Sequence, residues 1–426
     1  MSHNPASREA ATQDPVQSQD PVLTLFAKAE SAPRDVLSIS SLSLHCFRNY
    51  ASAHIEISPA PVVLTGRNGA GKTNILEAIS LLTPGRGLRR ARVSELNHRP
   101  HPDLLPVGKG DAPVEDVWAV SANITGMQGS VQIGTGRDPE AETDKRIVKM
   151  DGKTARSQAE LARHLAMIWL TPQMEQLFND GTSAGRRFFD RLVYSFDAEH
   201  ASRINEYDFA MRERNKLLAD NRADAAWLEA LEATMAETGA AIASARLLAC
   251  DHINHTIAAS TLSFPKAQLE IHGAIENGLA GGETAVTIEE WFKKKLREHR
   301  GRDAAAGRAL DGAHRSSLCV THIEKSMPAE RCSTGEQKAL LLSIVLAQAQ
   351  SGAKWHGVVP VLLLDEVAAH LDATRRLELF EEICQIGAQV WMTGTDPLLF
   401  EGMQGKAQFL RVENGSVVPA QAGIRY

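Results

Sequence analysis

One eight-residue segment constrains this chain more than any other: Gly66 to Thr73, with the sequence GRNGAGKT. It fits the pattern GxxxxGK[ST] in full, directly after the apolar run Val62–Leu64 and before a helical pattern that starts at Lys72. A glycine-rich turn at this place lets several backbone N–H groups face one position, where the helix dipole also favours an anion. The segment therefore predicts a phosphate-binding loop, and its context disfavours the alternative of an ordinary glycine-rich turn.

The residue types in the loop fit a nucleoside triphosphate with Mg²⁺. Lys72 supplies a positive charge for the β- and γ-phosphates, and Thr73 supplies a hydroxyl ligand for the metal ion. The residues expected to bind ATP in this loop are Gly66, Arg67, Asn68, Gly69, Ala70, Gly71, Lys72 and Thr73.

A second apolar segment, late in the chain, ends in two acids. Val361–Leu364 is a continuous apolar run, followed by Asp365 and Glu366. A buried strand delivers the next residue to the carboxyl edge of its sheet, where Asp365 would bind Mg²⁺ and Glu366 would polarise the attacking water. Taken alone, a strand followed by a polar turn explains the pattern equally well. With the phosphate loop upstream, we expect Lys72 and Glu366 to be catalytic.

The segment STGEQ at 333–337 precedes another helical pattern. Ser333 with Glu336 three positions later forms a capping-box pattern, which helix structure alone explains. An exposed helix N-terminus can also bind a γ-phosphate, and the two roles are compatible. We therefore expect Ser333, Gly335 and Gln337 to contact nucleotide.

The order of these segments resembles that of ABC ATPases. A phosphate loop, a long insertion, an SxGxQ segment, an apolar strand with two acids and Leu371–Asp372 resemble the Walker A, signature, Walker B and D-loop segments. The resemblance implies an α/β fold: an ABC-type ATPase head of mixed sheets and helices, with an inserted, mainly helical second lobe. It also implies an ATP-dependent homodimer in which each signature completes the partner's site. Asp372 could bridge that dimer, or only cap the helix that follows.

Five further segments resemble the RecF family. They are CFRNY at 46–50, GAGKTNILEAI at 69–79, TPGRG at 83–87, RRFFD at 186–190 and GTD at 394–396, and the similarity runs from Val36 to Val412. Two departures stand out. The family stretch GPHRDD corresponds to GAHRSS at 312–317, without acids at Ser316 and Ser317, and Glu366 occupies a position where the family commonly has Asp.

This resemblance implies a weak ATPase that uses ATP and Mg²⁺ in recombinational repair and replication-fork maintenance. Such a protein would dimerise with ATP on double-stranded DNA near single-strand gaps and help RecR load RecA. Arg48 would lie near the nucleotide, although a surface strand residue would have the same sequence context. Gln173 could sense Mg²⁺ and water, or be an exposed loop residue; His314 and Arg315 could face nucleotide or DNA, or form a surface turn.

Composition divides the chain into four predicted segments. Residues 1–35, rich in Ser, Ala, Gln, Pro and Asp, predict a disordered extension. Residues 36–180 and 311–426 would form the two parts of the ATPase head. Residues 181–310, with Ala, Glu, Arg and Leu at helical spacing, would form an inserted helical arm, too short for the long coiled coil of a structural SMC-type clamp.

The net charge of −6 means that any DNA contact must come from a local basic surface. Two runs are candidates, although such runs are usually only solvated faces. The first holds Arg86, Arg89, Arg90 and Arg92; the second holds Lys293, Lys294, Lys295, Arg297, His299, Arg300 and Arg302.

Other classes of protein fit less well. Five cysteines without a CxxC pair suggest neither a zinc site nor a disulfide framework. No apolar run approaches the roughly 18 residues of a membrane span, so we expect a cytoplasmic protein without membrane contact. The alternative function, an ABC ATPase subunit of a membrane transporter, is disfavoured by the RecF-like segments. A nuclease would need clustered acids beyond the ATP site.

Overall fold

The computed structural model describes residues 35–98, 117–126, 128–140, 144–220, 224–413 and 415–420. The disordered extension predicted for residues 1–35 lies, apart from Asp35, outside the described residues. The described part begins with β1 (Asp35–Val36), which pairs in parallel with β13 (Val358–Val359).

A six-stranded sheet forms the centre of the head, in the order β17-β16-β4-β15-β14-β9. The strands are β4 (Val62–Thr65), β9 (Met167–Leu170), β14 (Val361–Leu364), β15 (Val390–Gly394), β16 (Gln408–Glu413) and β17 (Ser416–Pro419). All pair in parallel except β17, which is antiparallel to β16. The carboxyl ends of β4, β14 and β9 therefore meet at one edge, although they come from distant parts of the chain.

Both faces of the central sheet are buried. Leu362 and Leu364 of β14 face a core shared with helices, whereas Val361 and Leu363 face a core shared with a second sheet. Alternate residues of a strand point to opposite faces, so a strand covered on both sides must be apolar throughout. This explains the continuous apolar run at Val361–Leu364 seen in the sequence.

The second sheet is antiparallel and runs in the order β3-β2-β5-β6-β7-β8. Its strands are β2 (Ser38–Phe47), β3 (Tyr50–Glu56), β5 (Ala119–Gly126), β6 (Gly129–Arg137), β7 (Arg146–Met150) and β8 (Lys153–Thr154). Asp151 and Gly152 form the hairpin turn between β7 and β8: both residues have positive φ, and Met150 pairs with Lys153 across the turn. Helix α2 (Lys72–Ser80) fills the space between the two sheets with Ile75, Leu76 and Ile79.

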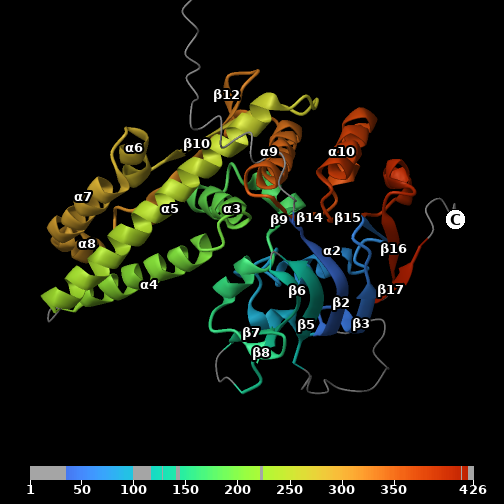
Figure 1. Cartoon of the computed structure of the whole chain (residues 1–426), viewed down its shortest axis with the longest axis horizontal. Helices are drawn as coiled ribbons and strands as arrows, with labels where there is room; N and C mark the ends of the chain where they lie inside the picture. The colour runs from blue at the N-terminus through green and yellow to red at the C-terminus, as the bar shows by residue number, and fades with distance from the viewer. Residues whose placement is uncertain are drawn as a thin grey trace, which may run out of the picture.

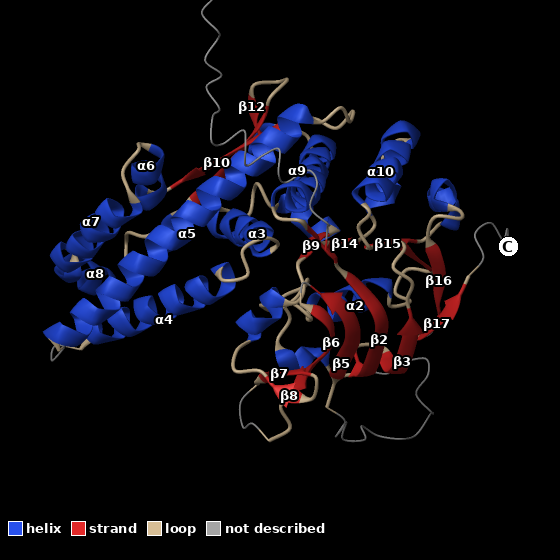
Figure 2. Cartoon of the chain, in the orientation of Figure 1, coloured by secondary structure: helices blue, strands red, loops and turns tan. Residues whose placement is uncertain are grey.

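Helices cover the other face of the central sheet, as Figures 1 and 2 show. They are α3 (Thr182–Tyr194), α9 (Thr334–Trp355), α10 (Ala373–Ile386) and part of α5 (Ala225–Ala259). The helical pattern predicted after the STGEQ segment is α9 and is confirmed.

The arm consists of α5 with α4 (His200–Ala219), α6 (Ala274–Ala280), α7 (Ala285–Glu298) and α8 (Arg300–Ala306), on the left in Figure 1. Helix α5 has 35 residues and belongs to two cores. Met235 and Ala236 pack in the arm with Phe292, whereas Ala249 and Ile253 pack in the core of the head. One continuous helix therefore joins the arm to the head.

A small antiparallel sheet consists of β10 (Ala267–His272), β11 (Ser317–His322) and β12 (Met327–Pro328). Its β10–β11 pairing crosses residue 310, where we predicted a domain boundary. The predicted division of the chain stays a proposal. Seven short 3₁₀ helices complete the described elements: η1 (Val93–Leu96), η3 (Gln158–Arg163), η4 (Pro172–Gln176), η5 (Ala313–Arg315), η6 (Ala329–Arg331), η7 (Val367–His370) and η8 (Pro397–Met403).

The five cysteines, all within the described residues, form no disulfide bond. Among the helices of the described residues, none combines the length and apolarity that crossing a bilayer requires.

Candidate nucleotide site

The phosphate loop joins β4 to α2 through backbone conformations that favour glycine. Gly66 has φ 150°, Gly69 has φ 78° and Gly71 has φ 114°. A Cβ atom at Gly71 would overlap the side chains of Asn49 and Tyr50, whereas one at Gly69 would meet nothing within 4 Å. The loop is thus packed tightly at its helix end and open at its tip, as a phosphate site requires.

Asn49 and Tyr50 fix the end of this loop from the strand that precedes it. The Asn49 side-chain amide donates to the Ala70 carbonyl (2.8 Å) and accepts from Asn74 (2.7 Å), and the Tyr50 hydroxyl donates to the Gly71 carbonyl (3.1 Å). Burial raises the pKa of Tyr50, so its hydroxyl keeps the proton that it donates. Our sequence analysis missed both residues, although they belong to the CFRNY segment that carried the resemblance.

Arg48 lies beside the phosphate-loop helix and is held there by a carboxylate. Its Nε and terminal nitrogen bind both oxygens of Glu77 at 2.9 and 2.6 Å, and a third bond goes to the Glu95 carbonyl. Arg89 reaches the same carboxylate (3.2 Å) and the Asn74 side chain (2.7 Å). Glu77 is buried, so its two arginine partners balance its charge. A contact of Arg48 with nucleotide stays a proposal.

Lys72 is buried against its own loop. Its Nζ donates to the carbonyls of Gly66 (2.8 Å) and Arg67 (3.2 Å), and lies 3.7 Å from Glu366 Oε1. The ammonium group therefore connects the phosphate loop to the acids at the end of β14.

Asp365 receives two hydroxyl groups from different ends of the chain. Thr73 Oγ1 donates to Asp365 Oδ1 over 3.0 Å, and Thr393 Oγ1 donates to the same oxygen over 2.7 Å. The backbone N–H of Glu366, a residue with φ 56°, donates to Thr393 Oγ1 over 2.9 Å. The structure thus brings Lys72, Thr73, Asp365 and Glu366 together. Thr393 is a site residue that we did not predict, although it directly precedes the GTD segment.

The donors at this place fit Mg²⁺. The ion prefers hard oxygen ligands and is held by one or two protein groups together with phosphate oxygens and water. The Thr73 hydroxyl and the Asp365 carboxylate are such a pair, already in contact. Within the described residues, no group of three or more His, Cys, Asp or Glu side chains is arranged to hold a metal by protein ligands alone.

The signature-like segment forms the N-terminus of α9. The predicted capping box is confirmed, since Ser333 Oγ accepts from the Glu336 N–H and the Glu336 carboxylate accepts from the Ser333 N–H. A Cβ added at Gly335 would meet no atom within 4 Å, so this end of the helix is open. The buried amide of Gln337 donates to the carbonyls of Ala329 and Cys332 and fixes the chain before the helix. The predicted contacts of Ser333, Gly335 and Gln337 with nucleotide stay proposals.

The remaining predicted residues lie at surfaces of the head. Gln173 is exposed in η4, just after β9. Asp372 caps α10, accepting the backbone N–H of Arg375 over 2.9 Å, so the capping interpretation is confirmed. Contacts of either residue with nucleotide or a second protomer stay proposals.

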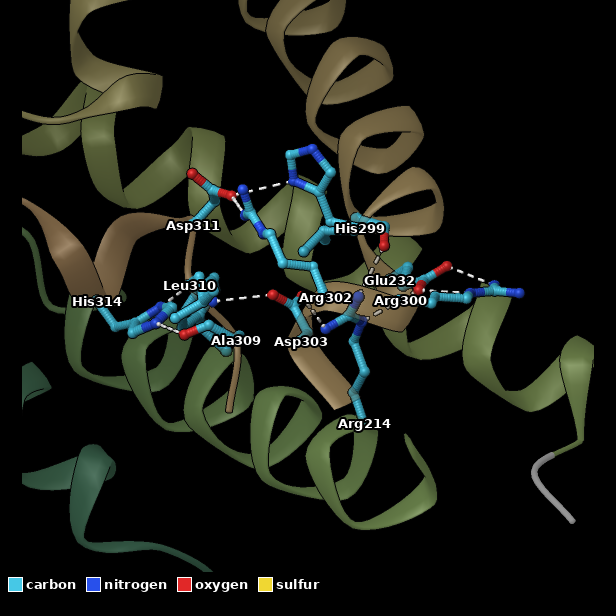
Figure 3. A network of polar contacts seen from close by, with 12 residues as sticks. Arg214, Glu232, His299, Arg300, Arg302, Asp303, Ala309, Leu310, Asp311 and His314 are labelled. Carbon is cyan, nitrogen blue, oxygen red and sulfur yellow. Dashed lines mark hydrogen bonds and ion pairs between the residues drawn. The ribbon is translucent and has the colours of Figure 1, made fainter. Parts of the chain in front are cut away.

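The second basic run lies in a network of ion pairs in the arm, which Figure 3 shows. Asp311 accepts from Lys295, His299 and Arg302, and Glu232 pairs with Arg300. Fully buried Arg214 joins Glu232 to Asp303 at 3.0 and 2.8 Å. Most charges of this run are therefore balanced within the arm.

His314 is also inside the arm rather than in a surface turn. Its Nε2 donates to the Ala309 carbonyl (3.1 Å), which leaves Nδ1 to accept the Tyr207 hydroxyl (2.9 Å). Arg315, the next residue, is exposed.

Comparisons with known proteins agree with this geometry. Residues 38–417 match the model of the RecF/RecN/SMC N-terminal domain. The chain is 46% identical over 389 residues to the DNA replication and repair protein RecF of Mesorhizobium japonicum, covering 90% of this chain and 98% of that protein. It is also 46% identical over 381 residues to RecF of Rhizobium meliloti, covering 89% and 98%.

The fold resembles that of a solved structure described as the recombination mediator protein RecF-ATP in the RecFOR pathway. The TM-score is 0.75 at 21% identity, covering 90% of this chain and 99% of that one. This likeness confirms the predicted ABC-type ATPase head. Because the domain match and the relatives extend over nearly the whole chain, this protein belongs to the RecF family.

Proposed function

We propose that this protein is an ATP-driven DNA-binding ATPase of recombinational repair and replication-fork maintenance. The observation that carries the proposal is the contact between Thr73 and Asp365, 292 positions apart in the sequence, beside the ion pair of Lys72 and Glu366. This is the set of groups that a triphosphate and its metal ion need. The relatives named as DNA replication and repair proteins supply the cellular context.

The phosphate loop would bind ATP through its backbone N–H groups and the positive end of α2. Lys72 would leave the carbonyls of Gly66 and Arg67 for the β- and γ-phosphates. Thr73 and Asp365 would hold Mg²⁺, which neutralises phosphate charge and orients the γ-phosphoryl group.

Hydrolysis would use Glu366 as the base. Its carboxylate would take a proton from water as the water oxygen bonds to the γ-phosphorus, and the bond from that phosphorus to the β–γ bridging oxygen breaks. Thr393, hydrogen-bonded to both Asp365 and the backbone of Glu366, would keep the two acids in fixed positions relative to each other.

Formation of the homodimer would depend on ATP, because the phosphate loop of one chain would contact only the inner side of the triphosphate. The open N-terminus of α9, with Ser333 and Gly335, would bind the γ-phosphate held by a second copy of the chain. Asp372 at the start of α10, Gln173 and Arg48 are the further residues proposed to sense nucleotide or the second protomer.

The proposed partner is double-stranded DNA next to a single-strand gap, with RecR, and RecA through it, as protein partners. These partners follow from membership of the family and from the RecFOR pathway named for the solved structure. The proposed place of action is the cytoplasm.

The test compares the wild type with Lys72→Met and Glu366→Gln in ATP binding, ATP turnover and sedimentation, with and without a gapped duplex. Glu366→Gln is expected to bind ATP, stop turnover and accumulate as a dimer on DNA, and Lys72→Met to bind no ATP. Turnover at the wild-type rate in Glu366→Gln would exclude Glu366 as the base. An ATP-loaded Glu366→Gln protein that stays monomeric would refute the shared site.

A further inference from the structure

Two basic runs in the sequence are candidates for DNA contact, and their surroundings differ. On the basis of the DNA-binding function proposed above, we propose that duplex DNA binds through its backbone phosphates in a groove between the loop 83–92 and helix α3. The run on α7 and α8 takes no part. We call this place the loop–α3 groove.

Exposed arginines line the groove without carboxylate partners. Arg86 and Arg90 lie on the loop, and Arg187 faces them from α3; all three are exposed. Among the described residues, none of the three forms an ion pair within 4 Å, and Arg187 has only a hydrogen bond to Ser183. Arg90 holds φ 57°, so the loop keeps a less favoured backbone conformation where it presents this side chain.

Arg191, one turn further along α3, lies deeper in the same cavity. Its guanidinium carbon lies 4.1 Å from the centre of the Trp169 ring, and its Nε is buried without a hydrogen-bond partner among the described residues. Burial lowers its pKa to about 9. A guanidinium with aromatic rather than carboxylate contacts keeps donors for an incoming phosphate oxygen.

Of the acids in the groove, Asp190 is already neutralised within the protein. Asp180, Asp190 and Asp208 line the same cavity of about 410 Å³. Asp190 is already bound by Arg246 through both oxygens, at 2.8 and 3.0 Å.

The groove continues into a second basic cavity of about 580 Å³, and the two share Pro84, Gly85 and Tyr194. Lys145 and Arg156 line the second cavity, and no acid among the described residues does. Buried Arg146 donates to the carbonyls of Gly85 (2.6 Å) and Thr83 (3.5 Å), which fixes the shared rim. Two adjoining basic cavities suit a chain of phosphates better than a single small anion.

The arm presents the contrasting case. His299, Arg300 and Arg302 form the ion pairs drawn in Figure 3. Lys295 pairs with Asp311, and Arg297 pairs with Glu229. A charge already neutralised within the protein releases few counterions from DNA. Lys293 and Lys294 on α7 are exposed, and Lys294 pairs with Glu298 at 3.9 Å. They are the control, matched in charge and exposure, for the exposed arginines in the groove.

The groove also lies against the ATP site. Trp169, under Arg191, belongs to β9, which pairs with β14 directly before Asp365. Thr171 and Gln173, after β9, line the groove as well. DNA bound here would therefore contact Arg191, which packs on the strand next to the acids, and this gives the ATP dependence of DNA binding a physical route.

The experiment measures binding of a fluorescent duplex across a salt series, with ATP, in the full-length Glu366→Gln protein. One variant adds Arg90→Ala and Arg187→Ala, and the control adds Lys293→Ala and Lys294→Ala. The log–log salt slope is expected to shrink by about 0.9 for each DNA phosphate that the variant no longer neutralises, hence by about 2 in the arginine variant for each protomer that contacts the duplex. The lysine control is expected to keep the slope. All four side chains are exposed, so folding is expected to survive.

An unchanged salt slope in the arginine variant, or a reduced salt slope in the lysine control, overturns the proposal that DNA binds in the loop–α3 groove. Loss of affinity for fluorescent ATP in the arginine variant, with the DNA slope unchanged, also overturns it and makes the groove a nucleotide site. Absence of any ATP-dependent duplex binding in the Glu366→Gln parent is a separate result, because it refutes the proposed function itself.

Discussion

Thr393 is bonded to Asp365 through its hydroxyl hydrogen, over 2.7 Å, and its oxygen accepts the backbone N–H of the following acid, Glu366, over 2.9 Å. Thr393 lies on β15, the strand beside β14, so this side chain reaches across one strand spacing. A single hydroxyl group thus sets the positions of both acids at the end of β14.

The first prediction tests this hydroxyl. Thr393→Val keeps the branched shape but removes both hydrogen bonds, and leaves the N–H of Glu366 without its partner. We expect the ATPase rate to fall roughly tenfold, as the loss of about 1–2 kcal/mol of positioning implies. ATP affinity should change little, because the phosphate loop is untouched. Thr393→Ser, which keeps the hydroxyl, is the control. Equal ATPase rates in the two variants would show that the Thr393 hydroxyl does not position the acids.

The sequence predicted the residues that carry ligand chemistry, because a phosphate loop and an apolar strand with two acids have strict local patterns. It did not predict Thr393, Asn49 or Tyr50, because their roles depend on which strands lie side by side. Parallel pairing of β4, β15 and β14 is a long-range outcome that no local pattern encodes.

The sequence also did not show which of the two basic runs is free to contact DNA. The run from 293 to 302 and the run from 86 to 92 look alike as strings of basic residues. In the structure, carboxylates of the arm such as Asp311 and Glu232 pair with most of the second run, whereas in the first run Arg89 pairs with Glu77. The proximity of Asp311 and Glu232 to the second run depends on how α4, α5, α7 and α8 pack. Gln337 shows the same limit, since its position fitted a nucleotide contact but its amide holds the backbone before α9.

A second prediction concerns Glu77, the carboxylate between Arg48 and Arg89. Glu77→Gln removes a buried charge and leaves two guanidinium groups without their counterion. We expect the free energy of unfolding to fall by about 2–3 kcal/mol, less than for a fully buried pair because both arginines reach solvent. Urea unfolding measures the change. Glu56→Gln, at an exposed site paired with His54, is the matched control and should change stability by less than about 0.5 kcal/mol.

A third prediction concerns pH. His356 stacks on Phe196 with ring centres 4.5 Å apart, and burial, with His252 nearby, lowers the pKa of His356 to about 4. The unfolded chain has a His356 pKa of about 6.5. As pH falls from about 6.5 toward 4, the unfolded chain therefore binds a proton at His356 that the folded chain does not, so the free energy of unfolding decreases. Between pH 7 and pH 5 we expect the free energy of unfolding to decrease by about 1 kcal/mol, a value that allows for the partial exposure of the His356 ring.

Replacing His356 by Phe tests the assignment, because the ring stacking is kept and the titrating group is removed. Thermal or urea unfolding at both pH values should show a smaller difference than in the wild type. His252, whose pKa burial also lowers, would account for the part that remains. An unchanged difference would show that His356 is not responsible.

The last prediction addresses Ser316, where relatives in the family have an acid. Ser316 is fully buried, and its hydroxyl donates to Glu276 Oε1 over 2.5 Å. Arg246 lies 3.2 Å from the same oxygen and donates to the Ala313 carbonyl over 2.8 Å. Glu276, from α6 in the arm, therefore supplies a carboxylate to Arg246 close to the position where the family acid would stand.

If Glu276 takes the place of that acid, adding a further carboxylate at position 316 should lower the free energy of unfolding. Arg246 already binds Asp190 and Glu276. Ser316→Asp would bury a third carboxylate beside this one guanidinium, and we expect it to destabilise the fold by about 3 kcal/mol. Glu276→Gln in the same chain should restore most of the loss, so the two changes should be strongly non-additive. Ser317→Asp, at the neighbouring, half-buried position, is the control and should cost little. Urea unfolding of the single and double variants gives the coupling free energy. A double variant as unstable as the sum of its single changes would show that Glu276 does not replace the family acid.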